Sequence, residues 1–129
     1  MDKKSELIRG WIHKAEHDLA MAELALKYKP ELRAPICFHC QQAVEKTLKA
    51  YLVYLDIPFK KTHSLTYLLD LISDNEDIGD KLYSYAEILE GYAVEIRYPD
   101  GSCEPTEGEA REAYKIAEEI KQIFIEKLG

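Results

Sequence analysis

The chain has 129 residues, a mass of 14.9 kDa and a formal net charge of −7 at pH 7. This length fits one domain over residues 1–129, and 47% apolar with 32% charged residues is too hydrophobic for a disordered chain and too charged for a membrane protein. The longest apolar run, residues 50–55, is far shorter than the ~20 residues that span a bilayer. The first residues lack the apolar core of a secretory signal, so we expect a cytoplasmic protein with no membrane contact.

Charge is divided unevenly along the chain. Residues 1–64 contain 11 Lys and Arg against 8 Asp and Glu, whereas residues 65–129 contain 6 against 16. The overall balance argues against a basic surface that coats nucleic acid, but it leaves open a local phosphate site in the first half. The chain has three cysteines, an odd number that cannot pair completely in disulfides, so we expect reduced thiols. A single asparagine among many Lys and Glu is typical of proteins from hot habitats.

Apolar residues recur at helical spacing along the chain, and no segment alternates with a period of two, so the sequence predicts an all-α fold. The first helix is expected over about residues 5–27, with Ser5 as its N-cap, before Pro30. A second helix is expected from near Pro35, which is acceptable in a first turn, to about residue 56.

Three further helices are expected in the second half. The short third helix covers residues 65–73, capped by Thr62 or Ser64, and the fourth runs over about residues 79–97. The fifth starts after Pro105, where Thr106 and Glu109 have the spacing of a capping box, and reaches Leu128. Four long helices and one short helix predict an antiparallel up-and-down bundle.

Helix order in such a bundle predicts which residues meet. We expect Arg97 and Tyr98, at the end of the fourth helix, to lie level with His39 at the start of the second. His63 is expected at the opposite end of the bundle, nearer His13.

The histidines and cysteines are the first candidates for metal or redox chemistry. His13 and His17 are four residues apart, but the intervening glutamate is not where the H-E-x-x-H motif places it, and no further ligands complete a site. Cys37 and Cys40 have C-x-x-C spacing without a second such pair or a βαβ pattern, which favours small buried side chains. We therefore expect no metal and no cofactor.

Residues 41–49 place polar side chains on two neighbouring faces of the second helix. Gln41 and Lys49 share one face with Glu45, and Gln42 and Lys46 share the next. One interpretation is ordinary pairing on a helix surface. The other is a polar groove in which Lys46 or Lys49 holds a phosphate and the amides contact a base or ribose.

Four segments together resemble the HEPN domain family. They are Ala-Glu-His-Asp-Leu-Ala at 15–20, Phe-His-Cys-Gln-Gln-Ala-Val-Glu-Lys-Thr-Leu-Lys-Ala at 38–50, Thr-His-Ser-Leu at 62–65 and Arg-Tyr-Pro at 97–99. The resemblance implies a five-helix bundle that is usually dimeric. It also implies one of two functions. Many stand-alone members are nucleotide-binding partners of a minimal nucleotidyltransferase in toxin–antitoxin pairs, and others are metal-independent ribonucleases.

The chain departs from the ribonuclease pattern of that family, an Arg followed after four to six residues by His. No histidine follows Arg97 within reach, so the usual base for a ribose 2′-hydroxyl is absent there. Arg33 and His39 have a matching separation but flank Pro35 at the start of the second helix, whereas the family's motif lies on a later helix. A displaced pair remains open, because antiparallel packing would bring His39 beside Arg97.

Three hypotheses follow for function. The first is a non-catalytic, homodimeric HEPN subunit that binds a nucleotide or RNA and a nucleotidyltransferase. The second is a ribonuclease toxin using His39 and Arg97, and the third is a structural interaction module. In the first, phosphate and polar contacts come from Gln41, Gln42, His39, Lys46, Lys49 and Arg97, and Tyr98 stacks on a base. The structural alternative makes Arg97 a cap for the fourth helix and Tyr98 part of its packed end.

Overall fold

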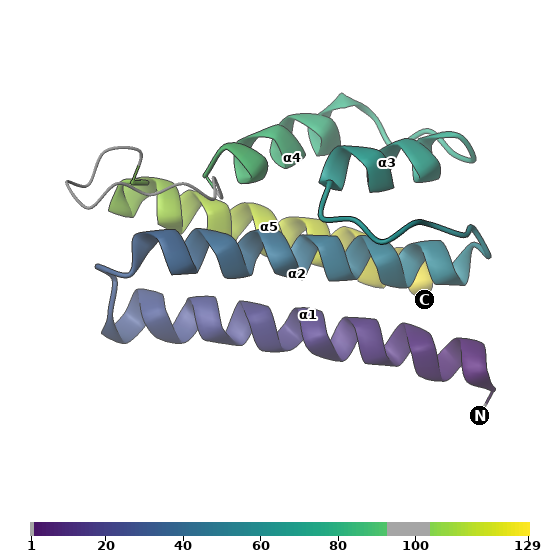
Figure 1. Ribbon diagram of the computed structural model, residues 1–129, viewed down its shortest axis with the longest axis horizontal. Helices are drawn as coiled ribbons and strands as arrows, with labels where there is room; N and C mark the ends of the chain where they lie inside the picture. The colour runs from purple at the N-terminus through teal and green to yellow at the C-terminus, as the bar shows by residue number, and fades with distance from the viewer. Residues whose placement is uncertain (1, 93–103) are drawn as a thin grey trace.

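The computed structural model describes residues 2–92 and 104–129. These residues form five helices and no strand: α1 (Lys3–Tyr28), α2 (Arg33–Tyr54), α3 (Leu65–Ser73), α4 (Asp80–Tyr92) and α5 (Glu107–Leu128). The long helices α1, α2 and α5 lie along one another, and the shorter α3 and α4 cover α2 and α5 on the side away from α1 (Figure 1). The predicted all-α, five-helix bundle is confirmed.

Capping explains where α1 begins. Ser5 is not its N-cap: the Asp2 carboxylate accepts a 2.7 Å hydrogen bond from the Ser5 backbone N–H, and the helix begins at Lys3. A carboxylate caps as well as a hydroxyl and also interacts favourably with the helix dipole, so the earlier start is the stable one. The same hydrogen bond lowers the pKa of Asp2.

The later helix boundaries follow the predicted signals closely. Ser64 caps α3, and Thr106 and Glu109 form the reciprocal capping box that begins α5. For the predicted fourth helix, the described residues contain α4 up to Tyr92, and the predicted remainder, with Arg97 and Tyr98, lies outside the described residues. Side-chain hydroxyls that satisfy unpaired N–H groups thus mark the starts of α3 and α5.

Helix α2 is the centre of the bundle. It contacts each of the other four helices, and its buried residues run from Ile36 to Leu52. Phe124 of α5 is fully buried and packs on Tyr51 of α2, with ring centroids 5.0 Å apart. The hydrophobic core is therefore arranged around α2, so any polar residue on this helix needs a partner or an opening to solvent.

Candidate functional site

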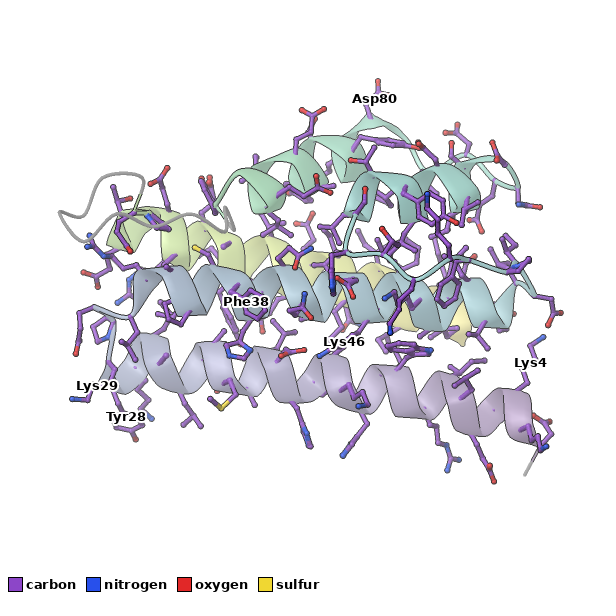
Figure 2. The ribbon with its side chains drawn as sticks, viewed as in Figure 1. Lys4, Tyr28, Lys29, Phe38, Lys46 and Asp80 are labelled. Carbon is purple, nitrogen blue, oxygen red and sulfur yellow. The ribbon has the colours of Figure 1, made fainter. Side chains whose placement is uncertain are left out.

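Helix α2 opens to solvent along one narrow strip in its central part. Between residues 36 and 52, only four residues are not buried: Phe38, His39, Gln42 and Lys46, hereafter the α2 strip. Phe38, Gln42 and Lys46 recur every four residues and so share one side of the helix. Figure 2 shows Phe38 and Lys46 on the same exposed side of α2, beside α1. The strip therefore presents an aromatic ring, an imidazole, an amide and an ammonium to solvent.

Asp18 of α1 borders the strip and holds two of its side chains. One carboxylate oxygen lies 2.9 Å from His39 Nδ1, and the other accepts a 2.6 Å hydrogen bond from Lys46 Nζ. The Asp18 side chain is only 11% exposed, compared with 31% for His39 and 22% for Lys46. Because Nδ1 faces Asp18, Nε2 on the other side of the ring is the nitrogen that His39 can offer to a ligand.

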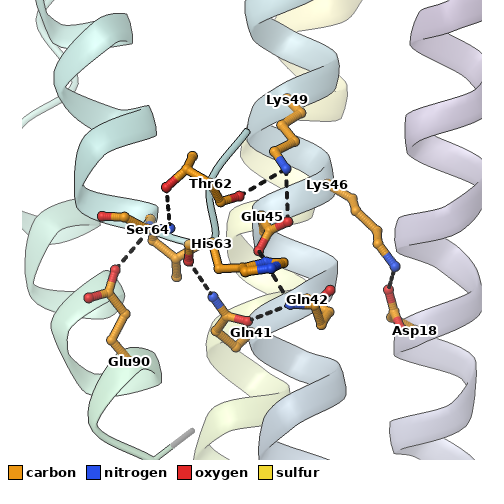
Figure 3. Close-up of polar contacts among 11 residues, drawn as sticks. Asp18, Gln41, Gln42, Glu45, Lys46, Lys49, Thr62, His63, Ser64 and Glu90 are labelled. Atoms are coloured by element: carbon orange, nitrogen blue, oxygen red, sulfur yellow. Dashed lines mark hydrogen bonds and ion pairs between the residues drawn. The ribbon is translucent and has the colours of Figure 1, made fainter. Parts of the chain in front are cut away.

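The neighbouring face of α2 is buried and holds the segment between α2 and α3. Gln41 Nε2 donates to the His63 carbonyl at 3.0 Å, and Lys49 Nζ donates to the Thr62 carbonyl at 3.0 Å and to Glu45 at 2.9 Å (Figure 3). Gln41 and Lys49 are each only 6% exposed. These two predicted binding residues therefore position a loop, and in the central part of α2 only the α2 strip faces solvent.

His63 lies beside the middle of α2 rather than at the end of the bundle. The segment after α2 runs back alongside that helix (Figure 1), which brings His63 Nδ1 to 3.0 Å from the buried Glu45 carboxylate. The His63 side chain is 83% exposed while Glu45 is 4% exposed. Gln42 donates to Glu45 and to Gln41, so it joins this network to the strip. The prediction that His63 lies at the end of the bundle was wrong, because the segment after α2 folds back along that helix.

His13, His17, Cys37 and Cys40 lie outside the α2 strip. His13 and His17 are exposed on α1, with ring centroids 4.2 Å apart. Among the described residues, no group of three or more His, Cys, Asp and Glu side chains could hold a metal ion. Cys37 and Cys40 are fully buried, as the sequence predicts, and burial raises the pKa of the Cys40 thiol. A protonated thiol is a poor nucleophile and a poor metal ligand.

Sequence reasoning missed Asp18 and Phe38. Asp18 lies within the apolar stripe of α1, between Ala15 and Ala22, and a carboxylate at such a position needs a polar partner from the facing helix. That break in the stripe was the available signal. No signal in the sequence marked Phe38, because its exposure depends on which side of α2 the other helices leave uncovered.

The fold and the α2 strip define a helical-bundle protein with a polar site on its central helix. The HEPN domain family matches residues 8–128, and the chain belongs to this family. Two solved structures are similar over 95% of this chain and 98% of their own. TT1696 from Thermus thermophilus is 30% identical with a TM-score of 0.79, and ST0689, an archaeal HEPN homologue, is 26% identical with a TM-score of 0.77. No curated protein matches the chain.

Within residues 2–92 and 104–129, none of the helices combines the length and the apolar character that crossing a bilayer requires.

Proposed function

We propose that the protein is a non-catalytic HEPN subunit that binds a nucleotide or nucleic-acid fragment at the α2 strip and works as a homodimer with a nucleotidyltransferase partner. The observation that carries the binding proposal is the strip itself. The central part of α2 is buried except at four residues, and those four include a lysine, a histidine and an aromatic ring. The family resemblance supports the dimer and the partner.

The chemistry of the strip suits a phosphate group. Lys46 offers an ammonium and His39 offers Nε2, while Gln42 between them donates its amide N–H groups to Gln41 and Glu45. Asp18 already orients Lys46 and His39 in the absence of a ligand, so binding orders few additional groups. The buried network of Gln41, Glu45 and Lys49 keeps the border of the site in place. These residues are positioning residues in the proposal.

Lys46→Gln is expected to weaken binding of a fluorescein-labelled RNA 8-mer about tenfold at 0.1 M salt, since a charge-assisted hydrogen bond of about 1.4 kcal/mol is lost. Fluorescence anisotropy measures the dissociation constant. The matched control is Lys115→Gln, which removes an exposed lysine from α5. Equal affinity in both variants, with unchanged melting temperatures, contradicts a phosphate contact at Lys46.

The contact between Asp18 and His39 favours the ribonuclease as the second candidate. A carboxylate on Nδ1 fixes the ring so that Nε2 points away from it, which is the geometry of a general base. Incubation of a mixed labelled RNA pool without metal distinguishes the two functions. The binding-subunit proposal predicts intact RNA at high protein concentration. Cleavage that is lost in both His39→Ala and Arg97→Ala would instead establish the displaced catalytic pair.

A further inference from the structure

We propose that the α2 strip binds an unpaired nucleotide of single-stranded RNA or DNA, with its base stacked on Phe38 and one phosphodiester held between His39 and Lys46. This inference rests on the proposed function and specifies its ligand. It selects a single strand over both a duplex and a free nucleoside triphosphate.

The exposed ring of Phe38 is the first reason to expect an unpaired base. It is 49% exposed on a helix whose other large apolar residues between 36 and 52 are buried. His39 contacts it in a T-shaped arrangement, with ring centroids 5.6 Å apart and planes at 77°, so the imidazole does not cover the phenyl ring by stacking on it. An exposed aromatic ring beside phosphate-binding groups is the usual platform for an unpaired base, whereas bases in a duplex are already stacked.

The spacing of the strip is the second reason. Phe38 and Lys46 are eight residues apart, which corresponds to about 12 Å along the helix axis at 1.5 Å per residue. Gln42 lies midway on the same side and His39 lies next to Phe38. The order along the strip is thus aromatic ring, imidazole, amide and ammonium. That order matches a base followed by its sugar and phosphate.

The small positive charge of the α2 strip is the third reason, and it favours a phosphodiester over a triphosphate. Lys46 is the single lysine or arginine of the strip, and the Asp18 carboxylate already neutralises it in part. The nearby Glu45 carboxylate is paired with Lys49, and the whole chain carries a net charge of −7. A phosphodiester brings one negative charge for these groups to accommodate. A triphosphate brings several, which so few cations cannot offset.

The test compares three probes by anisotropy or competition: a single-stranded RNA 8-mer, a blunt RNA duplex of the same sequence, and ATP. We expect the single strand to bind most tightly. Phe38→Ala should weaken its binding about 5- to 150-fold, the range for loss of one stacked base, while Phe38→Tyr should retain it. The matched control is Tyr28→Ala, which removes another exposed aromatic ring from the end of α1.

Salt dependence tests the phosphate contact separately. For a single strand, log K falls with log salt by about 0.7 per phosphate contacted, so Lys46→Gln should reduce that slope by about 0.7 while Phe38→Ala leaves it unchanged.

Three results would overturn the inference. Lys46-dependent binding of ATP without binding of the single strand would contradict this ligand and leave the proposed function standing. No binding of any probe would contradict both. Loss of self-association in Phe38→Ala, with RNA binding intact, would assign Phe38 to an interface between copies of the chain.

Discussion

Lys49→Met is expected to lower the free energy of unfolding by about 3–5 kcal/mol, because it removes the buried ammonium that pairs with the buried Glu45 carboxylate and leaves that carboxylate only the mostly exposed His63 and the Gln42 amide. The two side chains are 8% and 4% exposed, and Lys49 Nζ lies 2.9 Å from Glu45 Oε2. The Lys49 ammonium also lies over the rings of Trp11 and Phe59, 5.3 Å and 5.9 Å from their centroids, so little water reaches it. Urea denaturation at neutral pH measures the change.

Two further variants separate the buried charge from lost packing. The double variant Lys49→Met/Glu45→Leu should recover much of the stability, since an apolar pair of similar volume often replaces a buried ion pair at little cost. Lys81→Met is the matched control. It removes an exposed pair with Glu119 and should change stability by less than about 1 kcal/mol. If Lys49→Met costs no more than Lys81→Met, the buried pair is not a major source of stability.

Lys49→Met should affect stability and binding differently. Lys49 donates to the Thr62 carbonyl, so its loss releases one of the hydrogen bonds that hold the segment before α3 against α2. Gln41 still holds the His63 carbonyl, and Lys46 still contacts Asp18. We therefore expect stability to fall much more than affinity at the α2 strip.

Helix positions were predictable from the sequence because their signals are local. The spacing of apolar residues marks each helix, and Thr106 with Glu109 mark the start of α5. The grouping of Gln41, Glu45 and Lys49 on one face of α2 was also predictable, since it depends only on 3.6 residues per turn. Local patterns thus account for the elements and for which residues share a face.

The identity of the exposed face was not predictable. A helical wheel gives two polar faces on α2, but packing decides that Gln41 and Lys49 become buried while Gln42 and Lys46 keep access to solvent. The position of His63 depends on a segment without helical periodicity, whose course is fixed by hydrogen bonds from α2. Contacts between residues distant in sequence carry this information, and no single-helix pattern contains it.

Phe124→Ala is expected to lower the free energy of unfolding by about 3–5 kcal/mol, through lost burial and the cavity left behind. The ring is fully buried against Tyr51, whose hydroxyl group is hydrogen-bonded to Glu76. Thermal or urea unfolding measures the loss. Tyr54→Ala is the control, because Tyr54 contacts the same Tyr51 ring, with centroids 5.8 Å apart, but is 42% exposed and should cost much less.

The Phe124 variant also tests whether core and site are separate. Tyr51 lies on the side of α2 that packs on α5, whereas Lys46 contacts Asp18 of α1. At a temperature where Phe124→Ala is still folded, RNA affinity should therefore equal that of the unchanged protein. A parallel loss of affinity and stability would show that the α2 strip depends on the packing between α2 and α5, and the effects of Lys46 and Phe38 variants would then need correction for stability.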